Sequence, residues 1–199
     1  MIALRRYLKK LPEELEHIKL SKFHESKCKT INFYAMDESR FGLLSIHRRC
    51  LTAKGVKPII SYQHRFKNFY LFGAYSPVNG DHFTLEFPYC NSPCFEQYLD
   101  EFSKQNPEEF KILLLDNGAF HKAKDLAIPG NIALLFLPPY SPELNPAEWI
   151  WRHLKDRLAN ITFETLEDLS DKVCSLVKNL TADVILSITG WDLYSECII

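Results

Sequence analysis

The sequence has no long apolar run. Nowhere in its 199 residues do about 18 uncharged apolar residues follow one another, the length that a membrane-spanning helix needs. Arginines stand at positions 5 and 6, but the apolar segment of a secretory signal is missing after them. Internal repeats and low-complexity segments are also missing. We therefore expect a cytoplasmic chain that does not enter a membrane.

Cysteine is present but is not arranged for metal binding. The sequence contains no C-x-x-C pair, and Cys90 and Cys94, four residues apart, lack a second pair of zinc ligands. Because disulfides are rare in the cytosol, we expect reduced thiols. The six cysteines stand at positions 28, 50, 90, 94, 174 and 197.

The composition is that of a folded domain with an uneven charge distribution. The apolar fraction is 46% and the aromatic fraction 13%, which argues against disorder. Residues 1–70 hold 15 Lys and Arg against 6 Asp and Glu, whereas residues 81–199 hold 9 against 19. A basic region suggests contact with a polyanion such as nucleic acid. Ordinary solvated surface charge is the alternative interpretation.

The apolar pattern predicts an α/β fold with a mixed sheet. Residues 31–36 and 112–115 are apolar runs typical of strands covered on both faces. The pattern predicts further strands at 48–53, 69–75, 82–87 and 132–137, a hairpin turn at 77–81, and helices within 1–25, 95–102, 119–126, 146–159 and 164–180. We divide the chain into a basic helical segment (1–29), an α/β domain (30–160) and a helical extension packed on it (161–199).

Two of the predicted strands end in an aspartate. Asp37 follows residues 31–36 and Asp116 follows residues 112–115. In such sheets ligands gather at the carboxyl ends of strands, although either aspartate could simply form a turn. We expect Glu38 to be solvated and unable to share a ligand with Asp37, because neighbouring side chains on a strand point in opposite directions.

A third carboxylate, Glu148, lies at the start of a helix after a proline-stiffened loop. With Asn145 as N-cap and Pro146 as the first helical residue, Glu148 is third, the position that a capping box uses. Arg152 and Lys155 continue the same stripe of the helix, where they suit phosphate or are merely solvated.

Together the three carboxylates predict a metal site. Hard oxygen ligands on separate elements suit Mg²⁺, and Mn²⁺ is a substitute of similar preference. Two such ions would activate an attacking oxygen and stabilise a leaving one in phosphodiester chemistry. Soft ligands are missing from the pattern, so zinc is disfavoured.

Three sequence blocks resemble the catalytic blocks of DDE transposases. They read YAMDESRF (34–41), LDNGAFHK (115–122) and LPPYSPELNPAE (137–148). The likeness is closest to the mariner-like superfamily, in its bacterial insertion-sequence branch, and covers about residues 30–160.

This resemblance implies a ribonuclease H-like fold, with a mixed five-stranded sheet flanked by helices and the first and fourth strands adjacent and parallel. It implies that Asp37, Asp116 and Glu148 bind two Mg²⁺ ions, that the enzyme cuts double-stranded DNA at transposon ends and that the liberated 3′-OH attacks target DNA. It also implies a homodimer that associates with the nucleoid. Such transposases carry N-terminal helix-turn-helix modules, and about 30 residues precede the first block here. We therefore expect a fragment, a truncated copy or a split-frame product, and for a split-frame product a separate subunit or frame would supply the module.

Basic residues around the three blocks are the candidate DNA contacts. Lys54 belongs to an Ala-Lys-Gly segment that resembles the family's short basic segment after the first block. His121 is read either as a contact to DNA or to the attacking hydroxyl, or as an ordinary surface histidine. The candidates are Arg40, Lys54, His121, Lys122, Arg152 and Lys155.

Other functions remain open. A catalytically silent remnant could bind DNA or a full-length transposase as a regulator. Another two-metal nuclease of the same fold, such as a resolvase or an RNA–DNA hybrid nuclease, would use the same carboxylates. A phosphatase with an aspartyl nucleophile is disfavoured, because it would need a carboxylate two residues after Asp37, where Ser39 stands.

Overall fold

The computed structural model describes residues 2–123, 126–190 and 194. The strands are β1 (Thr30–Gly42), β2 (Asn68–Tyr75), β3 (His82–Phe87), β4 (Glu109–Leu115) and β5 (Ile132–Phe136). The helices are α1 (Ile2–Ile18), α2 (Ser92–Lys104), α3 (Ala147–Leu158), α4 (Leu166–Lys178) and α5 (Ala182–Thr189). Short π or 3₁₀ turns are η1 (Lys19–Phe23), η2 (Ala119–Lys122) and η3 (Pro142–Leu144).

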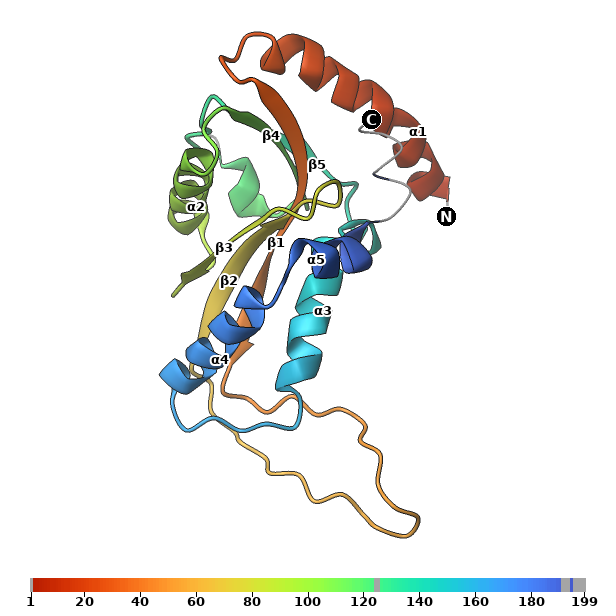
Figure 1. The fold of residues 1–199 in the computed structure, drawn as a ribbon, viewed down its shortest axis with the longest axis vertical. Helices are drawn as coiled ribbons and strands as arrows, with labels where there is room; N and C mark the ends of the chain where they lie inside the picture. The colour runs from red at the N-terminus through yellow and green to blue at the C-terminus, as the bar shows by residue number, and fades with distance from the viewer. Residues whose placement is uncertain (1, 124–125, 191–193, 195–199) are drawn as a thin grey trace.

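The strands form one five-stranded sheet with helices on both faces (Figure 1). Their order is β3-β2-β1-β4-β5; β1 pairs antiparallel with β2 and parallel with β4, and β4 pairs parallel with β5. The predicted mixed five-stranded sheet is therefore confirmed, together with the parallel pairing of the first and fourth strands.

Strand β1 is longer than the predicted strand 31–36, because its two neighbours pair with it over different lengths. The parallel pairing with β4 ends where Ala35 meets Leu114, whereas the antiparallel pairing with β2 continues to Gly42. Asp37 therefore lies inside β1, and the prediction that it ends the strand is wrong. Continued by two residues, the parallel register would place Asp37 level with Asp116, and both residues line one cavity.

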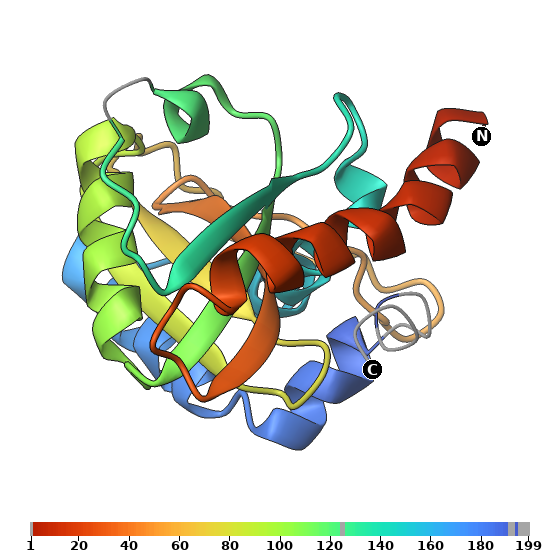
Figure 2. The same ribbon diagram turned by 90° about the horizontal axis from the view of Figure 1, so that it is seen from above.

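Helices cover the two faces of the sheet unequally (Figures 1 and 2). On one face, α1 packs on β4 and β5, and helices α3 to α5 pack on β1 and β2. On the other face, α2 packs on the central strands. Successive side chains of β1 point to opposite faces, so Asp37 shares the face of α3 and Glu38 shares the face of α2.

A long arm, residues 43–67, replaces the predicted strand 48–53. The arm leaves the sheet between β1 and β2 and extends away from the body of the molecule without a helix or strand (Figure 1). Its side chains from His47 to Ile59 are all exposed, so none of them is covered by another part of the molecule. A strand needs a partner and a covered face, and this segment has neither along 48–53, so that prediction is wrong.

The helices match the sequence pattern apart from their ends. Predicted helix 164–180 corresponds to α4, which begins with a capping box between Thr165 and Asp168. Predicted helix 119–126 is only the short turn η2 within the described residues. Helix α5 was not predicted, because eight residues give little periodicity.

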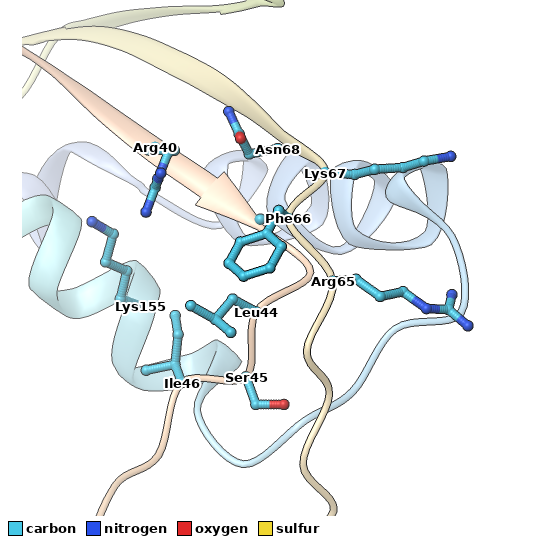
Figure 3. A pocket seen from close by; sticks show the side chains of 10 residues that line it. Arg40, Leu44, Ser45, Ile46, Arg65, Phe66, Lys67, Asn68 and Lys155 are labelled. Atoms are coloured by element: carbon cyan, nitrogen blue, oxygen red, sulfur yellow. The ribbon is translucent and has the colours of Figure 1, made fainter.

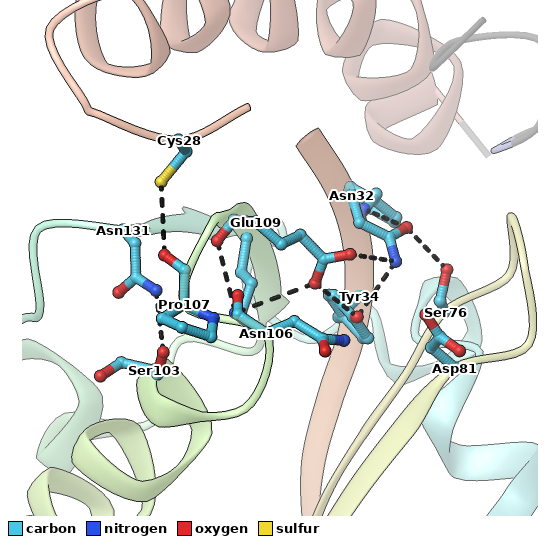
Figure 4. A network of polar contacts seen from close by, with 12 residues as sticks. Cys28, Asn32, Tyr34, Ser76, Asp81, Ser103, Asn106, Pro107, Glu109 and Asn131 are labelled. Atoms are coloured by element: carbon cyan, nitrogen blue, oxygen red, sulfur yellow. Dashed lines mark hydrogen bonds and ion pairs between the residues drawn. The ribbon is translucent and has the colours of Figure 1, made fainter. Parts of the chain in front are cut away.

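A buried polar network fixes the start of β1 (Figure 4). Asn32 donates to the Tyr34 hydroxyl over 3.0 Å, which in turn donates to Glu109 over 2.9 Å. Ser76, which directly follows β2, donates through its hydroxyl to Oδ1 of Asn32 over 3.0 Å. The network ties β1 to β4 at the end of the sheet opposite Asp37.

Two further sequence expectations concern the membrane and the cysteines. Among the described residues, no helix is both long enough and apolar enough to cross a membrane. The cysteines at 28, 50, 90, 94 and 174 are free thiols, as expected, and Cys197 lies outside the described residues.

Candidate active site

Asp37 is held by helix α3. The indole Nε1 of Trp151 donates to Oδ2 of Asp37 over 2.9 Å. Burial raises the pKa of Asp37 well above its usual range, and the charges of Glu38 and Glu148 raise it further. The backbone of α3 is anchored at the same place, since Asn145 donates through Nδ2 to the carbonyl of Met36 over 2.9 Å.

Asp116 follows β4 directly, as the sequence predicts. Its side chain is 57% exposed, and its Oδ1 accepts a hydrogen bond from the Gly118 N–H over 2.8 Å. The imidazole Nδ1 of His121 lies 3.0 Å from the same oxygen. The His121 contact and the Gly118 N–H lower the pKa of Asp116, so this carboxyl group is ionised at neutral pH.

Glu148 is the second residue of α3, one position earlier in the helix than predicted. The helix begins at Ala147, after Pro146, and its N-cap makes no side-chain hydrogen bond. Asn145 still assists the helix start, because its Oδ1 accepts from the Ala147 N–H over 3.1 Å. The predicted capping box is therefore wrong, and the exposed Glu148 carboxylate is not used to close the helix end.

The three predicted carboxylates line one cavity of about 460 Å³, here called the carboxylate cavity. They come from β1, the loop after β4 and the first turn of α3. The remaining wall is the loop after β5 with the residues around Asp116 and the helix start, namely Asn117, Gly118, Leu137, Pro138, Pro139, Tyr140, Ser141, Pro142 and Asn145. Asn117 donates to the Leu137 carbonyl and so joins the β4 end to that loop.

Two residues beside the cavity were placed wrongly by the sequence. Glu38 is not solvated: its side chain is only 7% exposed. His121 is not a surface residue, because it is 2% exposed and lies between Glu38 and Asp116. Burial lowers the pKa of His121, but these two carboxylates outweigh it and raise the value to about 9. A buried imidazole held on both sides is not placed to contact DNA, which corrects that assignment.

Sequence reasoning also missed Trp151 as a partner of the site. A tryptophan among the apolar residues of a helix indicates core packing, and Trp151 is indeed buried in the core. The available signal was its spacing of three residues from Glu148, which puts both side chains on neighbouring parts of one helical surface.

Arg40 and Lys155 lie at a second cavity, of about 300 Å³, between the end of β1 and α3. Figure 3 shows both side chains pointing toward the same space, whereas Arg65 and Lys67 extend away on the other side. The lining contains these four cations and no carboxylate. Burial lowers the pKa of Lys155, and Arg40 and Arg48 lower it too, although Glu148 and Asp37 act in the opposite direction.

Arg152 lies at a third cavity, of about 770 Å³, together with His47, Arg48, Arg49 and Asp156. Arg48 pairs with Asp156 over 2.8 Å, and this contact joins the arm to α3.

The last two candidate DNA contacts differ in their distance from the site. Lys122 is exposed and donates to Asn117, a lining residue of the carboxylate cavity. Lys54 is exposed on the arm and lines none of the three cavities described above.

The carboxylates are not gathered into a finished metal site. Within the described ranges, no three side chains of His, Cys, Asp or Glu are close enough together to hold a metal ion. The cavity brings the predicted ligands to one wall without fixing the distances between them.

Comparison with known proteins identifies similar sequences. A family model described as DDE superfamily endonuclease matches residues 32–170, a range that contains all three carboxylates. A protein of Sinorhizobium fredii (strain NBRC 101917 / NGR234), named uncharacterized protein y4pE/y4sA, is 36% identical over 108 residues, which are 53% of this chain and 80% of that protein.

Comparison with solved structures identifies the fold. The Mos1 transposase paired-end complex with left transposon end matches 97% of this chain with a TM-score of 0.63 and 17% identity. The Mos1 mariner paired end complex with Mn matches 96% with a TM-score of 0.64 and 17% identity. The complex with Mg matches 96% with a TM-score of 0.62 and 16% identity. This chain spans 61%, 60% and 60% of those chains, and the likeness shows the ribonuclease H-like fold.

Proposed function

This chain belongs to the DDE superfamily of endonucleases, and we propose that it is the catalytic domain of a DNA transposase. It cuts DNA at transposon ends and joins the liberated 3′-OH to target DNA, with Mg²⁺ or Mn²⁺ as cofactor. One observation carries the proposal: Asp37, Asp116 and Glu148, from three separate elements within the family match, line a single cavity.

The donor set fits a divalent cation. Carboxylate oxygens are the ligands that Mg²⁺ and Mn²⁺ prefer. Burial, and after it the charges of Glu38 and Glu148, raise the pKa of Asp37, and a bound cation would offset the repulsion between these carboxylates. Asp37, Asp116 and Glu148 would hold the metal. The Glu148 side chain is exposed and would move to reach the bound ion. When bound, two ions supply activation of the attacking oxygen and stabilisation of the leaving oxygen.

The protein's own groups orient these ligands. Trp151 holds one oxygen of Asp37 from α3, and the Gly118 N–H holds one oxygen of Asp116 from the loop. Asn145 anchors the start of α3 to β1, so the helix that carries Glu148 is fixed relative to Asp37. Each contact restricts a carboxylate before any ligand arrives, which reduces the entropy lost on binding.

Basic residues along α3 and the arm would bind the DNA backbone. Lys155 lies about 10 Å along the helix from Glu148, or about three base-pair steps of a DNA strand. Arg40 shares its cavity, and Arg152 shares the next cavity with Arg48 and Arg49. Lys122 and Lys54 are the remaining proposed contacts. We also propose that the protein acts as a homodimer on double-stranded DNA, at the nucleoid in the cytoplasm. A separate helix-turn-helix subunit would take part in DNA recognition.

A nicking assay tests the proposed chemistry. We expect supercoiled DNA or a terminal-repeat oligonucleotide to be nicked when Mg²⁺ or Mn²⁺ is added and not when EDTA is present. Asp116→Asn should abolish nicking with no loss of folded protein by circular dichroism. Asp171→Asn, an exposed position on α4, is the matched control and should retain full activity. Nicking that survives Asp116→Asn would show that the assigned site is wrong.

Two outcomes of the same assay point to the other candidates. A DNA-binding regulator without catalysis is favoured by the finding that no three metal-ligating side chains stand together in the described ranges; it predicts binding without nicking. A nuclease of the same fold predicts nicked products but no covalent joining of a 3′-OH end to target DNA.

A further inference from the structure

His121 connects two carboxylates across the sheet. Its Nε2 lies 2.9 Å from Oε1 of Glu38, and its Nδ1 lies 3.0 Å from Oδ1 of Asp116. The side chains of His121 and Glu38 are 1% and 7% exposed, whereas that of Asp116 is 57% exposed. The imidazole therefore links a buried carboxylate to one that faces the carboxylate cavity.

The imidazole ring is enclosed by aromatic side chains. The ring of Phe95, on α2, has its centroid 4.7 Å from that of His121, and the ring of Phe120 lies 4.1 Å away. Phe95 is fully buried. These neighbours restrict rotation of the imidazole, so Nε2 stays within hydrogen-bonding distance of Glu38 and Nδ1 stays 3.0 Å from Oδ1 of Asp116.

The backbone at Gly118 lies against both Asp116 and His121. A Cβ atom at this position would lie 3.0 Å from Oδ1 of Asp116 and 3.0 Å from Nδ1 of His121. Because the glycine has no side chain, its N–H reaches the same Oδ1 over 2.8 Å. One oxygen of Asp116 is thus held from two directions, and Oδ2 is the oxygen that remains for a ligand.

We propose that His121 is a positioning residue that fixes the Asp116 carboxylate for metal binding, with Glu38 as its anchor on the opposite face of the sheet. The proposal rests on the function proposed above. Neither His121 nor Glu38 lines the carboxylate cavity, so both act through Asp116 rather than on the substrate.

The alternative is that the contact between His121 and Glu38 only stabilises the core, and the cost of burying two polar groups argues against it. Burying a carboxylate and an imidazole costs desolvation free energy that an apolar pair of similar volume avoids. Contacts of this kind contribute orientation more than stability. Some groups contact a metal ligand without binding the metal itself. Their removal commonly lowers metal affinity or activity by about 10–100-fold.

The experiment compares full-length His121→Ala, His121→Gln and Glu38→Gln with the wild-type protein. Direct binding of Mn²⁺ to the metal-free protein is measured by calorimetry, and nicking is measured as kcat and as KM for DNA. We expect His121→Ala to weaken Mn²⁺ binding by at least about tenfold and to lower kcat, with KM for DNA within about twofold. His121→Gln, which can still donate one hydrogen bond, should recover part of the affinity.

A double variant tests the role of Glu38. If Glu38 acts only through His121, then Glu38→Gln should weaken Mn²⁺ binding in the wild-type background and have no further effect in His121→Ala. The matched control is His17→Ala, an exposed histidine on α1, which should bind Mn²⁺ like the wild type.

The outcomes separate this inference from the proposed function. Folded His121 variants with wild-type Mn²⁺ affinity would overturn the positioning role, even if the wild type nicks DNA. Loss of folding in both His121→Ala and His121→Gln would also overturn it, because His121 would then be a structural residue. Weakened Mn²⁺ binding in a protein that never nicks DNA would support the positioning role and reject the nuclease.

Discussion

The indole of Trp151 and the carboxylate of Asp37 join helix α3 to strand β1 through a hydrogen bond of 2.9 Å. Gly73 on β2 makes this approach possible, since a Cβ there would lie 2.8 Å from the Trp151 ring and 2.5 Å from the hydroxyl oxygen of Tyr75. Helix α3 carries Glu148 three residues earlier, so one helix supplies one carboxylate and orients another.

Replacement of Trp151 by phenylalanine removes the donor and keeps an aromatic ring. Because an intramolecular hydrogen bond contributes about 0.5–1.5 kcal/mol, we expect the free energy of unfolding to fall by at least about that amount. Nicking should fall by more than tenfold, since Asp37 is no longer oriented. Denaturant titration and the nicking assay measure both effects. Trp149→Phe, at a position 44% exposed on the same helix, is the control for stability and should change it by less than about 0.5 kcal/mol.

Gly118 offers a second test of the site. Gly118→Ala places a methyl group against both Asp116 and His121, so we expect nicking to fall by about tenfold or more while the protein stays folded. Gly130→Ala is the matched control, because a Cβ at Gly130 meets no atom within 4 Å. Equal activities of the two variants would contradict the crowding that the structure shows at Gly118.

The sequence predicts the three carboxylates of the carboxylate cavity better than it predicts their surroundings. Apolar runs before Asp37 and Asp116 mark buried strands, and the proline-rich loop before Glu148 marks a helix start, because these signals are local. The parallel pairing of β1 with β4 brings the two aspartates together, and it follows from the resemblance rather than from the periodicity.

The misplaced residues depend on contacts between segments far apart in the sequence. Glu38 and His121 are 83 residues apart, and nothing local distinguishes a buried histidine from a surface one. Strand β1 extends beyond residue 36 because β2 pairs with it, and the arm stays irregular because no strand lies beside it. Such outcomes are decided by tertiary packing, which residue spacing does not encode.

The salt dependence of DNA binding tests the basic residues of the third cavity. Arg49→Ala and Arg152→Ala should each weaken binding to different DNA sequences by similar factors. If each side chain neutralises one phosphate, the slope of log K against log salt becomes less steep by about 0.9 per variant. Fluorescence anisotropy without a divalent metal, at several salt concentrations, gives these slopes. Lys172→Ala, an exposed position on α4 that lines none of the three cavities, should leave the slope unchanged.

The stability of the fold should decrease in alkaline solution because buried tyrosines resist ionisation. Burial raises the pKa of Tyr7, Tyr34, Tyr75 and Tyr98 above the ordinary value of 10.0, and the charge of Glu109 raises that of Tyr34 further. Above about pH 10 the unfolded chain loses these protons while the folded chain keeps them. The folded state then binds more protons than the unfolded state, so the free energy of unfolding falls as pH rises.

Tyr34→Phe isolates one of these groups. At pH 8 the variant should be less stable than the wild type by about 1–3 kcal/mol, because Asn32 and Glu109 lose their shared hydroxyl partner. Above pH 10 the stability of the variant should fall less steeply than that of the wild type, because one phenol fewer ionises when the chain unfolds. The two slopes should differ by up to about 1.4 kcal/mol per pH unit. Urea titrations from pH 8 to 11 should therefore show the two proteins converging. Tyr62→Phe, at a position 64% exposed on the arm, reports the effect of losing an exposed phenol. Parallel curves of unfolding free energy against pH for the wild type and Tyr34→Phe would contradict this prediction. The hydroxyl between Asn32 and Glu109 would then be accessible to water in the folded state.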